Sequence, residues 1–145
     1  MKTRWMVLAA AAIALTGCQQ PTRVENAWVR LSAVPGRPAA AYATIQPGSL
    51  GQALIGVASP AVGRIELHES MTGHGGMGMM RPLERVALTA HEPTTLAPGG
   101  IHAMLFDLKG GLRPGGTIPL TFRFDGSQDI IVDAKLVGAG DPAPK

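Results

Sequence analysis

Glycine and proline interrupt this chain so often that a long helix has no room to form. The 145 residues include 19 glycines and 12 prolines, and both residue types disfavour the interior of a helix. Turn sequences recur at Pro35-Gly36, Pro47-Gly48, Pro98-Gly99-Gly100, Pro114-Gly115-Gly116 and Asp125-Gly126. Turns at this frequency indicate many short strands rather than helices.

Between the turns, apolar residues alternate with polar ones, which is typical of half-buried strands. The runs that predict strands are residues 24–31, 40–46, 53–58, 64–69, 80–88, 101–108, 117–124 and 129–137. Eight such runs predict an all-β fold, an antiparallel β-sandwich or barrel. We expect one domain over residues 24–138 and a flexible tail over 139–145.

The first residues predict export and a lipid anchor. Two basic residues precede an apolar run, residues 5–15, that is too short to span a bilayer comfortably, so residues 1–17 are expected to be a signal peptide. The run ends in Leu15-Thr16-Gly17-Cys18, which resembles the lipobox of bacterial lipoproteins. This resemblance implies cleavage before Cys18, lipidation of that cysteine, and a tether over residues 18–23. The alternative is an ordinary secreted protein with a stray cysteine. By resemblance to Gram-negative sorting patterns, Gln19 after the cysteine favours the outer membrane, with the domain in the periplasm.

The charge balance argues against nucleic-acid binding, and the cysteine content argues against a metal site with thiolate ligands. Loss of residues 1–17 removes Lys2 and Arg4 from the thirteen basic residues and none of the ten acidic ones, so eleven basic residues would face ten acidic ones. No basic stripe interleaved with aromatic residues occurs, and we therefore expect no nucleic-acid binding. Cys18 is the only cysteine, so a metal site in the domain must use His, Met or carboxylate side chains.

Histidine and methionine are concentrated in two short segments. The members are His68, Met71, His74, Met77, Met79, Met80, His102 and Met104, which include every methionine after residue 17. Methionines that only fill gaps in a core are usually spread among several strands. Several of these residues stand instead beside glycines in the loop over 74–80, where core packing is not expected. His91, in a separate segment, is expected to be a surface turn residue.

The spacing of these residues favours one soft-metal site. His102 and Met104 stand at i and i+2, so on a strand both side chains project from the same face, about 7 Å apart at the backbone. His68 at the end of one run and Met80 at the start of the next can supply two more donors. Two imidazoles with two thioethers favour Cu(I) over Zn(II), Ca(II) or Mg(II). A blue-copper centre would need a thiolate ligand, and Cys18 is committed to lipid.

Several segments carry a resemblance to a known family. They are Ala27-Trp28-Val29-Arg30, Ala40-Ala41-Tyr42, Glu66-Leu67-His68-Glu69, Met80-Arg81-Pro82-Leu83, the run from Pro98 to Leu105, and Leu112-Arg113-Pro114-Gly115. In this order they resemble the periplasmic copper chaperones often called PCuAC, whose motif is His, then Met, then His-x-Met. The resemblance implies a cupredoxin-like β-sandwich that holds Cu(I) through His68, Met80, His102 and Met104.

The spacing within this motif leaves one ligand open. Twenty-one residues separate Met80 from His102, as in the family, but eleven separate His68 from Met80, one more than the usual ten. Either the glycine-rich loop carries an inserted residue, or Met79 replaces Met80; the Met-Arg-Pro context favours Met80. His74, Met77 and Met79 are either auxiliary copper donors or solvated loop residues.

The resemblance implies delivery of Cu(I) to the copper centre of a respiratory cytochrome oxidase, with a recipient oxidase subunit or another copper chaperone as partner. The alternative is a lipoprotein that buffers periplasmic copper without a dedicated recipient. A structural domain without metal is a third reading, in which the methionine clustering is coincidence. Glu66 and Glu69 flank His68, but neither belongs to a zincin-type helical motif, so we expect no enzyme activity. We also expect a monomeric domain.

Overall fold

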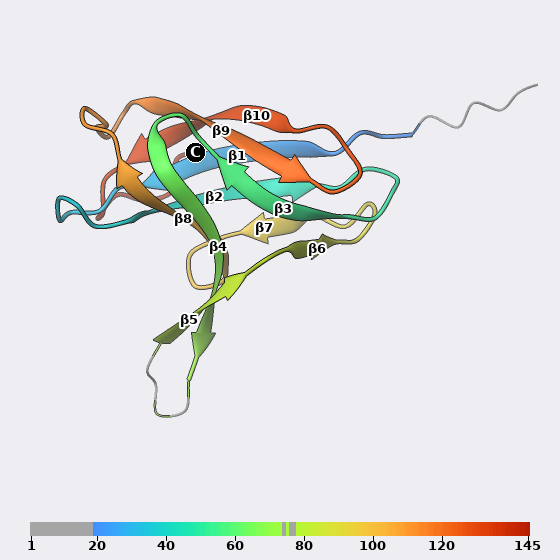
Figure 1. Cartoon of the computed structure of the whole chain (residues 1–145), viewed down its shortest axis with the longest axis horizontal. Helices are drawn as coiled ribbons and strands as arrows, with labels where there is room; N and C mark the ends of the chain where they lie inside the picture. The colour runs from blue at the N-terminus through green and yellow to red at the C-terminus, as the bar shows by residue number, and fades with distance from the viewer. Residues whose placement is uncertain (1–18, 74, 76–77) are drawn as a thin grey trace, which may run out of the picture.

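The computed structural model describes residues 19–73, 75 and 78–145, and ten strands account for its regular structure (Figure 1). The strands are β1 Arg23–Arg30, β2 Ala39–Gln46, β3 Gln52–Ala58, β4 Val62–Thr72, β5 Gly78–Leu83, β6 Val86–Leu88, β7 Thr94–Leu96, β8 Ile101–Leu108, β9 Thr117–Phe124 and β10 Ile130–Val137. Each expected run therefore contains strand, and the all-β prediction is confirmed. Within the described residues, no helix is both long enough and apolar enough to cross a bilayer.

The strands form one sheet in the order β5-β4-β8-β2-β1-β10-β9-β3-β6, and β7 pairs with β2 beside this path. Among the described strands every pairing is antiparallel except that of β1 with β10, where Trp28 aligns with Lys135. The expectation of a wholly antiparallel fold is corrected at this pair. Parallel neighbours need a long crossover between them, and here most of the domain is that crossover.

The sheet curls round a single core, and β3 lies against β4, its neighbour along the chain (Figure 1). Alternate residues of the strands point inward, as a period of two requires. The largest fully buried side chains are Phe122, Ile45, Leu54, Leu96, Leu105, Leu120 and Val29. In the described part of the chain, β5 is the one strand that contributes no fully buried residue to this core.

One predicted strand is divided in the structure, and one observed strand was not predicted. The single run expected over 80–88 is two strands, because β5 pairs with β4 whereas β6 pairs with β3, and the chain changes partner at Glu84–Arg85. The strand β7 was not expected, since Thr94, Thr95 and Leu96 are too few to show an alternation. Its pairing with β2 supplies the order that the local sequence lacks.

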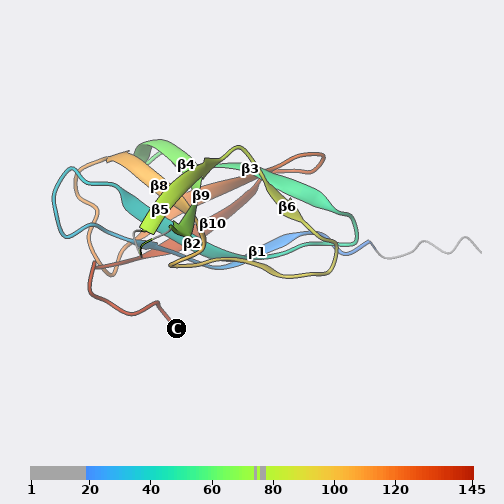
Figure 2. The same ribbon diagram turned by 90° about the horizontal axis from the view of Figure 1, so that it is seen from below.

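The outer part of the β4–β5 hairpin projects from the curled sheet (Figure 1), and Figure 2 views the molecule from the side toward which it projects. We call residues 69–73, 75 and 78–81 the distal hairpin. At its root Leu67 is buried and its cross-strand partner Leu83 packs against the core. Beyond this pair, Met71, Met79 and Met80 are exposed. The distal hairpin is thus held by its backbone ladder rather than by core packing.

A bulge in β1 decides which face of the sheet receives Trp28. Asn26 has a φ of 52°, and the pairing with β2 shifts register between Glu25 and Trp28. Asparagine tolerates this left-handed conformation better than most residues. The bulge inverts the alternation, so that Val24 and Val29 both point into the core. Trp28 is thereby directed to the outer face of the sheet.

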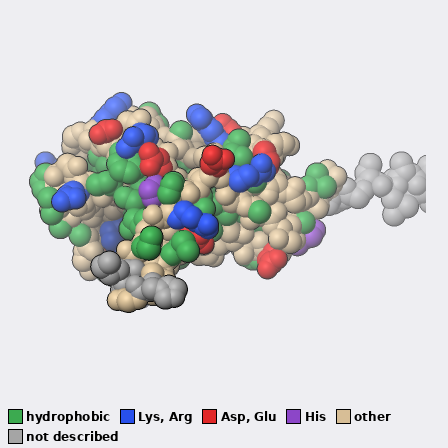
Figure 3. All heavy atoms as spheres, turned by 60° about the horizontal axis from the view of Figure 1, so that its bottom comes forward, with side chains coloured by type: hydrophobic (Ala, Val, Ile, Leu, Met, Phe, Trp, Pro, Cys, Tyr) green, Lys and Arg blue, Asp and Glu red, His purple; other side chains and the backbone are tan. Residues whose placement is uncertain are grey.

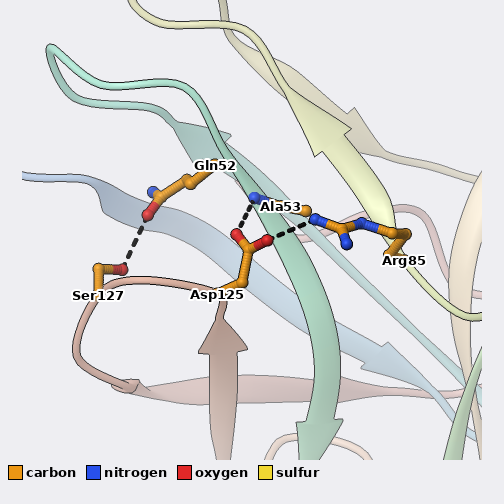
Figure 4. Close-up of polar contacts among 5 residues, drawn as sticks. All are labelled: Gln52, Ala53, Arg85, Asp125 and Ser127. Atoms are coloured by element: carbon orange, nitrogen blue, oxygen red, sulfur yellow. Dashed lines mark hydrogen bonds and ion pairs between the residues drawn. The ribbon is translucent and has the colours of Figure 1, made fainter.

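A polar network fastens the end of the sheet at which β1 begins (Figure 4). The Asp125 carboxylate accepts a hydrogen bond from the Ala53 N–H at 2.6 Å and another from Arg85. Gln52 Oε1 accepts a hydrogen bond from Ser127 Oγ at 2.8 Å. The bond from Ala53 and the neighbouring Arg85 guanidinium hold the pKa of Asp125 below its ordinary value.

Candidate metal centre

Two expected metal donors, His68 on β4 and His102 on β8, stand directly opposite each other in the sheet. Their ring centroids are 6.2 Å apart. Their chain neighbours Leu67 and Ala103 are buried in the core, so both imidazoles lie on the outer face. The His102 residue is only 4% exposed and the His68 side chain 15%. The antiparallel register therefore brings together two donors that are 34 positions apart in the sequence.

The orientation of His102 is fixed by a backbone carbonyl. His102 Nδ1 lies 2.9 Å from Gly100 O. A carbonyl can only accept, so Nδ1 carries the hydrogen and Nε2 keeps its lone pair. The same carbonyl accepts the backbone N–H of Ser70 at 3.1 Å, which ties the root of the distal hairpin to the start of β8. His102 thus has one nitrogen suited to bind a metal ion.

The orientation of His68 is fixed by a carboxylate. His68 Nε2 lies 3.0 Å from Glu66 Oε2, and the other oxygen of Glu66 is 3.2 Å from Arg64 Nε. Paired with an ionised carboxylate, Nε2 carries the hydrogen and Nδ1 the lone pair. That Nδ1 is buried and has no hydrogen-bond partner among the residues that the structure describes. A buried polar atom of this kind usually needs a partner, and a bound metal ion would supply one.

Met104 lies on the same face of the sheet as the two histidines. It lies two positions after His102 on β8, and its cross-strand partners are Glu66 on β4 and Ala40 on β2. Its side chain shares the outer face and is half-buried. His68, His102 and Met104 therefore lie on one face of two adjacent strands.

The register of the hairpin separates the two candidate loop ligands. Met80 aligns with Ser70, and Met79 aligns with Met71. Residues opposite each other in an antiparallel pair share a face, and faces alternate along a strand. Met80 therefore lies on the face of Ser70 and His68, whereas Met79 lies on the other face. Both methionines are exposed, at 60% and 63%.

Two aromatic side chains continue the row of the two histidines across the sheet. This row was not predicted from the sequence. The ring centroids of Trp28 and Tyr42 are 4.4 Å apart, and those of Tyr42 and His102 are 6.4 Å apart. With His68 the row crosses β1, β2, β8 and β4. Burial raises the pKa of the Tyr42 phenol, and Arg30 partly opposes this shift. The phenol is therefore neutral near neutral pH and offers a metal ion no anionic oxygen.

Other expected residues lie apart from this group or outside the described chain. His91 lies in an exposed turn with a φ of 61°, where its N–H is bonded to Gly48 O. Cys18, His74 and Met77 fall outside the described residues. Within those residues, no three His, Cys, Asp or Glu side chains come together as a metal site.

The contact of Glu66 with His68 was also missed by sequence reasoning. The two residues stand at i and i+2 on β4, so their shared face could have been predicted, but the side-chain orientation could not. Figure 3 looks onto the side from which the distal hairpin projects, and hydrophobic, basic and acidic side chains are intermixed on that face.

Comparison with known families places the chain. A family model described as "Putative lipoprotein LpqE-like" matches residues 22–136. The chain belongs to the LpqE-like lipoprotein family. A relative from Leifsonia xyli subsp. xyli (strain CTCB07), named "Putative lipoprotein Lxx21020", is 34% identical over 139 residues, which cover 86% of this chain and 83% of the relative.

Solved structures confirm the fold of this LpqE-like protein. The apo PCuAC domain from PmoF1 is 27% identical with a TM-score of 0.68, over 83% of this chain and 96% of that domain. The Cu(I) form of DR1885 from Deinococcus radiodurans, solved in solution, is 28% identical with a TM-score of 0.62, over 84% of this chain and 83% of that one. The expected cupredoxin-like fold of PCuAC domains is therefore confirmed.

Proposed function

We propose that this LpqE-like lipoprotein is a periplasmic Cu(I) metallochaperone whose ligands are His68, Met80, His102 and Met104. The proposal rests on the direct pairing of His68 with His102, each held by a hydrogen bond that leaves one ring nitrogen as a donor. His68 would bind through Nδ1 and His102 through Nε2. Fixed tautomers of this kind are a usual feature of histidine ligands.

The donor set favours Cu(I) over harder ions. Thioether and neutral imidazole are soft to borderline ligands, and no carboxylate or thiolate joins them in the proposed set. The Cu(I) form of DR1885, a structural neighbour at 28% identity, supports the same ion for this chain. The alternation of faces along β5 supports Met80 over Met79 as the fourth ligand, because only Met80 shares the face of His68. His74, Met77 and Met79 would then be auxiliary at most.

Transfer to a cytochrome oxidase copper centre is chemically favourable from such a site. Four neutral ligands leave the positive charge of Cu(I) uncompensated, so a recipient with anionic thiolates should take the ion. Met80, on the exposed distal hairpin, is the donor best placed to be exchanged first. The recipient would be an oxidase subunit or an intermediate copper chaperone. No catalytic step is part of this role.

The lipid anchor is part of the proposal. Cleavage before Cys18 would leave residues 18–23 as a tether to the membrane, with the outer membrane favoured, and would hold the domain in the periplasm. Membership in a lipoprotein family supports this arrangement. Replacement of Cys18 by Ser should release the protein from membranes without changing its copper stoichiometry. Retention on membranes without incorporated lipid would contradict the anchor.

Copper titration with X-ray absorption tests the site. We expect one tight equivalent of Cu(I), with sulfur and nitrogen scatterers both in the first shell. The double variant His68→Ala with His102→Ala should lose this equivalent, while His91→Ala, a change in an exposed turn, should retain it. Tight binding that survives the double variant would contradict the assignment.

A deletion strain separates delivery from buffering. If the protein delivers copper, the strain should lose oxidase activity in limiting copper and regain it when copper is added. If the protein only buffers periplasmic copper, oxidase activity should be normal and the strain should be sensitive to excess copper. The second pattern would contradict the chaperone role while leaving the copper site intact.

A further inference from the structure

Two methionines lie on the face of the distal hairpin opposite that of His68, which we call the back face. The described residues show no packing role for them. Met71 and Met79 stand directly opposite each other on β4 and β5, and they are 46% and 63% exposed. Neither belongs to the core or to the partly buried residues packed against it. The next pair toward the core is an ion pair, Glu69 with Arg81, with 2.5 Å between Oε2 and the guanidinium.

The intervening ion pair means that the two methionines do not extend the hydrophobic core. Exposed strand positions usually favour β-branched or aromatic residues over a flexible thioether. Side chains directly opposite each other have Cβ atoms about 4.5–5.5 Å apart. Methionine has three rotatable bonds, so both sulfur atoms can turn toward one point between the strands.

We propose that Met71 and Met79 form a second, exposed binding site for a soft monovalent cation, Cu(I) or Ag(I). Paired thioethers select soft metal ions and have little affinity for Zn(II), Ca(II) or Mg(II). The neighbouring charges of Glu69 and Arg81 offset each other, so the site adds no net negative charge. With two neutral donors on exposed side chains, this site binds more weakly than one with four donors.

The two sites lie on opposite faces of the same hairpin. Met79 and Met80 are consecutive, and their side chains alternate between the back face and the face of His68. An ion captured at Met71 and Met79 is therefore one residue away from the proposed ligand Met80. The methionine pair could therefore be the point at which an ion enters the proposed Cu(I) site. This role rests on the proposed Cu(I) site, whereas binding of an ion at the methionine pair does not depend on it.

Titration with Ag(I), which has the electronic configuration of Cu(I) and resists oxidation, tests the pair. The full chain carrying Cys18→Ser removes the one thiol, and methionine methyl groups labelled with carbon-13 report each thioether separately by NMR. We expect the methyl signals of Met80 and Met104 to move with the first equivalent. The signals of Met71 and Met79 should move together with a second, weaker equivalent.

The controls compare Met79 and Met80, which are neighbours in the chain and nearly equally exposed. The double change Met71→Leu with Met79→Leu should abolish the second equivalent and keep the first, whereas Met80→Leu should weaken the first and keep the second. Unmoved Met71 and Met79 signals, or a second equivalent that survives the double change, would overturn the pair. A missing first equivalent would overturn the proposed function instead, so the two failures are distinguishable.

Discussion

The strands β8 and β5 would supply copper donors in opposite ways. On β8, His102 is almost fully buried, Met104 is half-buried, and both flank Ala103, a core residue. On β5, Met80 is 60% exposed, and the strand contributes no fully buried residue among those described. Donors embedded in a packed sheet are held in position before the ion arrives. A donor on an exposed arm can leave without disturbing the core.

This difference suits a protein that must hold an ion and then release it. In the proposed site, the buried half would set the geometry and the exposed half would control access. It also means that substitutions in the two regions should separate binding from stability. Loss of His102 on β8 should affect both quantities, whereas loss of Met80 on β5 should affect binding alone.

The largest effect is expected for His102→Ala. The substitution removes a proposed ligand and a buried side chain that packs beside Tyr42. Cu(I) affinity should fall by more than the about 10–100-fold typical of losing an outer-shell partner. The free energy of unfolding of the apoprotein should fall by about 1–3 kcal/mol, since buried hydrogen-bonded groups are disturbed. Competition with a chromogenic Cu(I) chelator and denaturant unfolding measure the two effects. Unchanged affinity would remove His102 from the site.

A smaller and more selective effect is expected for Met80→Leu. The first-equivalent affinity for Cu(I) should fall because a thioether is lost, but the unfolding free energy should stay within about 0.5 kcal/mol, as at other exposed positions. The matched variant Met79→Leu removes a thioether of similar exposure from the other face and should leave that affinity unchanged. The same titration and unfolding measurements apply. If Met79→Leu weakens the first equivalent and Met80→Leu does not, the ligand assignment must be reversed.

Glu66 should have a moderate effect although it is not a proposed ligand. Glu66→Ala removes the acceptor that keeps the hydrogen of His68 on Nε2, so Cu(I) affinity should fall about 10-fold. Glu66→Gln keeps an acceptor oxygen and should restore most of it. Nitrogen-15 NMR of the His68 ring reads the tautomer directly. If the tautomer and affinity are the same in Glu66→Ala as in the unaltered protein, Glu66 does not position His68.

Much of this arrangement could be predicted from the sequence because it depends on strand periodicity. Alternation located the strands, and the i, i+2 spacing put His102 and Met104 on one face, as the structure has them. Partner choice could not be predicted, because alternation carries no information on which strands pair or in which direction. The parallel pairing of β1 with β10 was therefore missed. The strand β7 was missed because it is too short to show an alternation.

Two features of the candidate site needed the register or the side-chain orientation. Spacing alone left Met79 and Met80 open, and only the alignment of Met80 with Ser70 separates their faces. The position of Trp28 beside Tyr42 depends on the bulge at Asn26, which inverts the alternation within β1. The bond from His68 to Glu66 depends on the side-chain torsions of both residues. A local sequence pattern does not fix these quantities.

The smallest effect on copper is expected at Asp125, in the network beside the first residues of the domain, and there stability alone should respond. The Ala53 N–H and Arg85 hold the pKa of Asp125 below the ordinary value of about 3.9. A carboxyl group with a lowered pKa stabilises the fold above its ordinary value, and this contribution is lost as the pH falls through the lowered one. Asp125→Asn should therefore reduce stability at neutral pH and weaken the dependence of stability on pH below about 4, with Cu(I) affinity unchanged. Thermal unfolding across this pH range, with copper titration at neutral pH, measures both. An unaltered acid dependence would show that Asp125 contributes nothing there, and a change in copper affinity would show that the two regions are coupled.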